Sequence, residues 1–151
     1  MTPSRQTQRI HELAPGLTVA RGAAGRSLNI YPLGSVVIDS GVRWRRRWLE
    51  RQLRGRHLTA HVPTHAHFDH AGSLAWLCRT FDVRLWCGAG DADAMSSGRV
   101  DTCCAPFNRL QHTLLPVAAH LVGRALREGD SLGGFEVLVL NPAPAPTGGS
   151  T

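Results

Sequence analysis

Four potential metal ligands occupy a stretch of six residues near the middle of this 151-residue chain. The segment Thr64–Gly72 reads THAHFDHAG, and its donors are His65, His67, Asp69 and His70. Imidazole and carboxylate groups are the ligands that bind Zn²⁺ or a similar borderline metal. Extended backbone points alternate residues to one side, so the first three donors can converge, and the chain must turn at His70 to add the fourth. A histidine-rich surface loop is the plain alternative, and chance gives this pattern in roughly one such chain in a thousand.

The residues around this motif predict a strand before it and a helix after it. Residues 57–64 contain an apolar, strand-like stretch, and residues 71–81 carry apolar side chains at helical spacing. Pro63 removes a backbone donor that a central strand would use, so pairing should end at Val62.

The rest of the chain alternates between short strands and helices. Residues 17–20, 28–31 and 36–39 predict a small antiparallel meander, and residues 83–87 and 121–123 predict further strands. Residues 90–97 predict a short helix, with Asp91 near its start in a capping or turn role.

At the motif, the chain resembles the metallo-β-lactamase superfamily, whose signature is His-x-His-x-Asp-His between a strand and a helix. Residues 35–41 (SVVIDSG) resemble the strand of this family that ends in Asp-x-Gly. The resemblance extends over roughly residues 15–150. It implies an α+β fold, the αβ/βα sandwich, with helices outside and metals at one edge between the sheets. A complete domain is longer, so we expect a partial sandwich: the N-terminal half, with a mixed or antiparallel sheet and flanking helices.

The resemblance implies a role for each donor. His65 and His67 would share one ion with a later histidine, while Asp69 and His70 would hold a second ion with downstream partners. Asp69 is the candidate catalytic residue, because it would also orient the attacking hydroxide. Asp39 would sit outside the ligand set and orient one metal-bound imidazole; an ordinary turn carboxylate is the equal alternative. The implied cofactor is Zn²⁺, as one or two ions, with Fe or Mn as alternatives.

The later ligand loop of the family usually reads like Pro-Gly-His-Thr-x-Gly-Ser after a strand. Residues 135–140 predict that strand, but Pro146 stands where the ligand histidine belongs, and proline has no donor atom. The residues after the strand are either a degraded ligand loop or a neutral tail, and the two interpretations have equal weight. His112 and His120 are expected on or near packed surface.

Three parts are predicted from these patterns: an N-terminal extension at 1–14, an incomplete metallo-β-lactamase-like domain at 15–140, and a Pro/Gly-rich tail at 141–151. No apolar run approaches the ~20 residues of a membrane span, and the first fourteen residues lack the apolar core of a signal peptide. We therefore expect a cytoplasmic protein without a membrane partner. Half a sandwich leaves sheet edges uncovered, which predicts self-association.

All 17 basic residues are arginines, the net charge is +6, and seven of the arginines lie between Arg43 and Arg56. Trp44 and Trp48 are spaced by one helical turn, so the segment predicts an amphipathic helix with a cationic outer face. Such a helix could bind nucleic acid phosphates. The favoured interpretation is an outer helix whose tryptophan pair lies in the core.

The function that the resemblance implies is metal-dependent hydrolysis, in which a metal-activated hydroxide attacks an ester, thioester, lactone or related bond of a small-molecule substrate. Two alternatives stay open. The first is a truncated, catalytically impaired member with at most a weak metal site. The second is a nucleic-acid-binding module that uses the Arg43–Arg56 helix.

Overall fold

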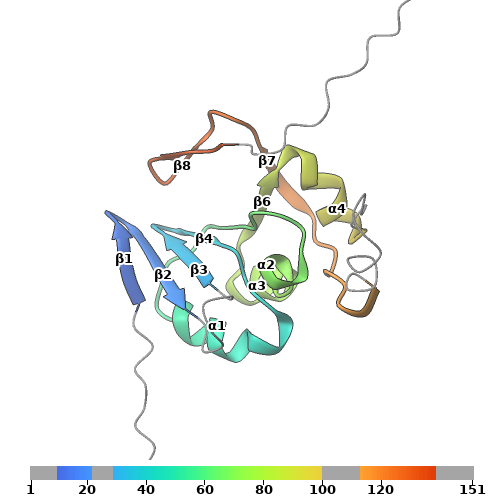
Figure 1. Ribbon diagram of the computed structural model, residues 1–151, viewed down its shortest axis with the longest axis horizontal. Helices are drawn as coiled ribbons and strands as arrows, with labels where there is room; N and C mark the ends of the chain where they lie inside the picture. The colour runs from blue at the N-terminus through green and yellow to red at the C-terminus, as the bar shows by residue number, and fades with distance from the viewer. Residues whose placement is uncertain (1–9, 22–28, 100–112, 139–151) are drawn as a thin grey trace, which may run out of the picture.

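The computed structural model describes residues 10–21, 29–99 and 113–138. A mixed sheet of seven strands, in the order β1 to β7, forms the centre of the molecule (Figure 1). A separate hairpin of two short strands comes after it in the chain. The strands are β1 (Ile10–Ala14), β2 (Leu17–Arg21), β3 (Asn29–Leu33), β4 (Val36–Ile38), β5 (Ala60–Val62), β6 (Arg84–Gly88), β7 (Val122–Leu126), β8 (Ser131–Leu132) and β9 (Phe135–Glu136).

Strands β1 to β4 pair in an antiparallel manner, and β4 to β7 pair in parallel. Parallel neighbours need crossover connections, which helices provide here. Helix α1 connects β4 to β5, and helices α2 and α3 connect β5 to β6. The helical elements are the 3₁₀ turns η1 (Arg43–Arg45) and η2 (Ala89–Asp91), and the helices α1 (Arg46–Leu53), α2 (Phe68–Ala71), α3 (Leu74–Phe81) and α4 (Ala92–Ser97).

The predicted α+β architecture, with a mixed sheet and flanking helices, is confirmed, and so is the antiparallel meander. Pairing of β5 ends at Val62, one residue before Pro63, so the proline replaces no ladder hydrogen bond. Strand β1 lies inside the stretch that the sequence analysis placed in an N-terminal extension, and it pairs with β2. No helix in the described residues is long and apolar enough to cross a membrane.

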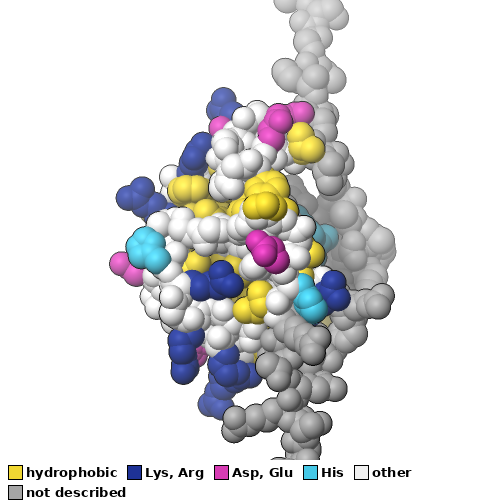
Figure 2. Space-filling model, turned by 90° about the vertical axis from the view of Figure 1, so that its left-hand side faces the viewer, with side chains coloured by type: hydrophobic (Ala, Val, Ile, Leu, Met, Phe, Trp, Pro, Cys, Tyr) yellow, Lys and Arg dark blue, Asp and Glu magenta, His cyan; other side chains and the backbone are white. Residues whose placement is uncertain are grey.

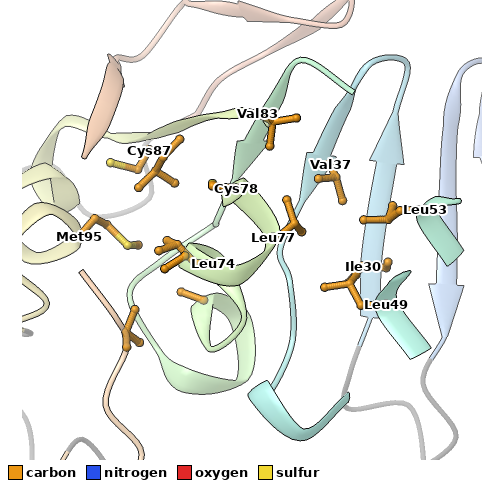
Figure 3. Packing of buried hydrophobic residues seen from close by; sticks show 14 of the residues in the cluster. Ile30, Val37, Leu49, Leu53, Leu74, Leu77, Cys78, Val83, Cys87 and Met95 are labelled. Carbon is orange, nitrogen blue, oxygen red and sulfur yellow. The ribbon is translucent and has the colours of Figure 1, made fainter. Parts of the chain in front are cut away.

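The main core lies between the sheet and helices α1 and α3 (Figure 3). Leu49 and Leu53 of α1 and Leu77 of α3 are buried against sheet residues such as Ile30 and Val37. Burying a leucine side chain fully contributes about 1.5–3 kcal/mol. These contacts fix both crossover helices on one face of the sheet.

The expected tryptophan pair is split between core and surface. Trp48 is 5% exposed and belongs to the core, whereas Trp44 is 61% exposed. The prediction that both rings are buried is therefore wrong. Trp44 lies in η1, before α1 begins at Arg46, so the regular helical spacing does not reach it.

The opposite face of the sheet carries a second, smaller apolar cluster. Side chains alternate along a strand, so Val36 points into this cluster while Val37 points into the main core. Leu132 of the β8–β9 hairpin packs on it, beside Ala60 and Val62. Figure 2 views the molecule from the side where β1 lies. On this side, exposed hydrophobic side chains are interspersed with arginines.

Candidate metal centre

The motif begins directly after β5, at the edge of the sheet where the parallel strands end. The chain bends from Thr64 to Ala66, and α2 begins at Phe68 with His67 as its extended N-cap (φ −90°, ψ 150°). The predicted extended alternation therefore does not continue through the motif to Asp69. The chain turns before Asp69, earlier than expected, because the helix begins there.

This turn gathers the donors. The ring centroids of His65 and His67 are 4.6 Å apart, and those of His65 and His70 are 4.1 Å apart. Nε2 of His70 lies 3.6 Å from Oδ2 of Asp69, and both side chains are partly exposed. All four donors thus meet in one small region at the surface.

Asp39, which follows β4, contacts both Thr64 and His70 and so holds this region in place. Its carboxylate accepts hydrogen bonds from the backbone N–H of Thr64 (2.8 Å) and from the Thr64 hydroxyl (2.9 Å). Its Oδ2 also lies 2.8 Å from Nδ1 of His70. With its proton on Nδ1, His70 keeps Nε2 as an acceptor, which is the nitrogen a metal would use. The hydrogen bond to Asp39 raises the pKa of His70, partly offset by burial.

The backbone of Asp39 adopts a left-handed conformation with φ 61°, and the residue is 2% exposed. An L residue adopts this region rarely, and aspartate is among the residues that tolerate it best. The surrounding hydrogen bonds hold the strained conformation in place.

The loop after β4 is joined to the motif by its next residues as well. Ser40 donates from its backbone N–H (2.7 Å) and from its hydroxyl (3.1 Å) to the carbonyl oxygen of His70. Ser73 donates from its N–H to Gly41 and from its buried hydroxyl to Val42, both at 3.1 Å. The sequence analysis did not predict that Ser40, Ser73 and Thr64 would join the two segments. The only available signal was that small hydroxyl residues lie in or beside residues 35–41 and 64–72.

The electrostatics favour neutral imidazole at His65. Burial lowers its pKa, and the neighbouring His70 and His67 lower it further, while Asp39 and Asp69 oppose this shift. A neutral ring nitrogen is the form that binds a metal.

The donor chemistry fits a zinc-type ion, although the described residues do not close a site. Three imidazoles and a carboxylate lie together, and one imidazole is oriented by a buried carboxylate. Within residues 10–21, 29–99 and 113–138, no group of three or more His, Cys, Asp or Glu side chains has metal-holding geometry. The motif therefore provides part of a ligand set.

Asp91, which was predicted to have a capping or turn role, lies near the motif. It precedes α4, but its side chain makes no capping hydrogen bond to that helix. Its pKa is raised by burial, while His65 and His67 lower it. β6 leads to this residue and β5 leads to the motif. Since these neighbours are parallel, both ends lie at the same edge of the sheet.

Of the other histidines, His61 is fully buried on β5, and neither ring nitrogen has a hydrogen-bond partner among the described residues. Burial lowers its pKa to about 4. His120 is partly buried, and its backbone N–H donates to the carbonyl of Met95 (3.0 Å). His112, Pro146 and residues 139–140 of the predicted last strand lie outside the described residues.

Known proteins were found that match this chain in sequence family and in fold. The family model described as Metallo-beta-lactamase superfamily matches residues 31–151. A variant of the metallo-beta-lactamase from Cronobacter sakazakii is 22% identical, with a TM-score of 0.66; the match covers 83% of this chain and 51% of that one. A class B3 di-zinc metallo-beta-lactamase from an Alaskan soil metagenome is 18% identical, with a TM-score of 0.67 and coverage of 82% and 47%.

A beta-lactamase domain protein from Burkholderia ambifaria is 26% identical, with a TM-score of 0.58 and coverage of 84% and 45%. The chain thus spans about half the length of the solved structures it matches. No curated protein matches it.

Proposed function

Because this chain belongs to the metallo-beta-lactamase superfamily, we propose that it forms the motif-bearing part of a zinc-dependent hydrolase for a small-molecule ester, thioester, lactone or related bond. Its fold is consistent with the N-terminal half of the metallo-β-lactamase fold. The single observation that carries the proposal is the 2.8 Å contact of the Asp39 carboxylate with His70 inside a cluster of three imidazoles. Buried carboxylates that hold a metal-ligating imidazole are typical of such sites.

Each residue has a definite task in this proposal. His65 and His67 would provide imidazole donors for one ion position, and Asp69 and His70 would provide donors for a second. The chemistry that zinc supplies in such a site is activation of water near neutral pH and polarisation of the scissile carbonyl. Asp69, whose side chain is 40% exposed, would hold its ion and orient the attacking water. Asp39 keeps the proton of His70 on Nδ1.

The test is zinc retention by the purified chain after dialysis, measured by elemental analysis and paired with zinc-dependent hydrolysis of an ester and lactone panel. We expect bound zinc in the native chain and its loss in the double variant His65→Ala/His67→Ala. His57→Ala is the matched control, because His57 is exposed and precedes the motif. Equal zinc content in the double variant and the control would show that the motif holds no metal.

A catalytically impaired member is the second candidate, favoured by the absence of a closed ligand group in the described part of the chain. Two donors for each ion position give weaker binding than the three or four protein ligands of typical zinc sites. In this case the native chain would take up zinc in excess metal, lose it on dialysis and hydrolyse none of the panel.

A further inference from the structure

Asp91 carries a partly buried carboxylate that no described residue pairs with. It is the last residue of η2, the 3₁₀ turn that comes directly after β6. Its side chain makes no capping hydrogen bond to α4, and it forms no ion pair or other hydrogen bond with a residue that the structure describes. Charges withdrawn from water are normally paired or bind a metal ion, so an unpartnered carboxylate at this depth requires an explanation.

The fold brings this carboxylate to the edge of the sheet where the motif begins. β5 leads into the motif and β6 leads into η2, and because these strands are parallel neighbours, both segments leave the sheet at the same edge. The side chain of Asp91 folds back over the end of β6, since a methyl group added to Gly88 would lie 3.9 Å from Oδ2 of Asp91. The carboxylate therefore lies over the last residue of that strand.

His65 and His67 are the motif residues whose charges act on Asp91. Burial raises the pKa of Asp91, and these two imidazoles lower it. Asp91 thus lies within electrostatic reach of the pair of donors that was assigned to one ion position.

That ion position lacks a protein ligand. Two imidazoles provide two donors and no negative charge, whereas catalytic zinc sites have three protein ligands, and two histidines with one carboxylate are a recurring set. A nearby carboxylate would complete such a set and would offset part of the charge of the ion. The electrostatic cost of burying Asp91 would then be offset by the metal.

Metal binding through Asp91 requires a rotation of its side chain. In the present arrangement, no three such donors in the described part of the chain have metal-holding geometry. The carboxylate must therefore turn from Gly88 toward the imidazoles when the ion binds. This rotation breaks no hydrogen bond to a described residue, because the carboxylate makes none.

We propose that Asp91 is the third protein ligand of the ion held by His65 and His67, so that this position has a set of two histidines and one carboxylate. The inference rests on the proposed function for the presence of the ion, and it adds a ligand that comes from β6 and η2 rather than from the motif.

The first experiment is a zinc titration of the full chain in competition with a chromophoric chelator. We expect Asp91→Asn and Asp91→Ala to bind zinc at least about tenfold more weakly, a loss that is typical even for residues that only support a ligand. Asp91→His should restore most of the affinity, because imidazole is also a zinc donor. Asp93→Asn is the matched control, since Asp93 is exposed on α4, and it should keep the native affinity.

Cobalt(II) distinguishes a ligand from a residue that acts through its charge alone. The visible absorption of bound cobalt depends on its ligand set, so both Asp91 variants should change the spectrum of the cobalt-saturated chain, and Asp93→Asn should not. In the metal-free state, the Asp91 variants should unfold at or above the native urea concentration, because the carboxylate has no described partner to lose.

Native zinc affinity, or an unchanged cobalt spectrum, in both folded Asp91 variants overturns the proposal. The double variant His65→Ala/His67→Ala separates this result from failure of the proposed function. If the double variant loses zinc while the Asp91 variants keep it, the motif binds metal and only the role of Asp91 is wrong. A native chain that binds no zinc overturns both.

Discussion

Oδ2 of Asp39 lies 2.8 Å from Nδ1 of His70, although 31 residues separate them in the chain. The contact joins the end of β4 to the turn of helix that comes after β5. Because Asp39 also binds both the N–H and the hydroxyl of Thr64, one buried carboxylate holds the two ends of the motif.

We expect Asp39→Asn to weaken zinc binding by about 10- to 100-fold and to lower the free energy of unfolding by about 1–3 kcal/mol. Asparagine tolerates the left-handed backbone, so the change removes the charge without adding backbone strain. It leaves one oxygen for the N–H of Thr64 and none for His70. A chelator competition assay and urea unfolding measure the two effects. Asp93→Asn on the exposed side of α4 is the control, and equal zinc affinity in both variants would make Asp39 an ordinary turn residue.

Gly72→Ala tests the packing of α2 against the loop after β4. The added methyl group would overlap the carbonyl of Phe68 and press on that of Gly41, so the helix turn must shift. We expect a loss of about 1–3 kcal/mol in unfolding free energy, typical of overpacking. Gly90→Ala meets no atom within 4 Å and is the matched control. If both variants unfold at the same urea concentration, the close approach at Gly72 is absent in solution.

The stability of the protein should fall on acidification, because His61 is buried in its neutral form. Burial lowers its pKa from 6.5 to about 4, while the nearby charge and backbone of Asp39 oppose this shift and His120 adds slightly to it. Between these two values the unfolded chain binds a proton that the folded chain does not. Protonation of His61 therefore does not affect the free energy of unfolding above pH 6.5. As the pH drops from 6.5 to 4, it lowers that free energy by about 3 kcal/mol. The raised pKa of His70 has the opposite effect on stability. Protonated His70 stabilises the folded state below pH 6.5, and this stabilisation is lost as the pH rises through the pKa of His70 in the folded protein.

His61→Leu isolates the first effect. It removes two ring nitrogens that have no partner in the described part of the chain, so we expect about 1–3 kcal/mol of added stability at pH 7. Urea unfolding at pH 7 and pH 5 should show a smaller difference in the variant than in the native chain. The exposed His57→Leu serves as control. An undiminished pH dependence in His61→Leu would place the titrating group elsewhere.

The two tryptophans of the arginine-rich segment should respond differently to truncation. Trp48→Ala removes a 5% exposed core residue and should cost about 3–5 kcal/mol. Trp44→Ala removes a 61% exposed side chain and should change the unfolding free energy by less than about 0.5 kcal/mol. Thermal or urea unfolding of the two variants gives the comparison directly. A large loss in Trp44→Ala would mean that this ring is covered in solution.

Local patterns predicted much of the architecture. The periodicity of residues 17–39 indicated the meander, and the apolar spacing of residues 71–81 indicated helix α3 with Leu74, Leu77 and Cys78 buried. Errors arose where one periodicity was extended too far. The helical spacing of Trp44 failed because the helix begins two residues later, and the strand-like alternation of the motif failed because α2 begins at Phe68.

The sequence by itself determined which donors are present and that a strand, a turn and a helix carry them, because side-chain chemistry and backbone periodicity are local properties. The tertiary structure decided which distant groups meet those donors. Asp39 reaches His70, Ser73 reaches Val42 and Asp91 lies near His65 because parallel strands β4, β5 and β6 end side by side. The order of strands in a sheet depends on how the whole core packs, and no short stretch of residues encodes it.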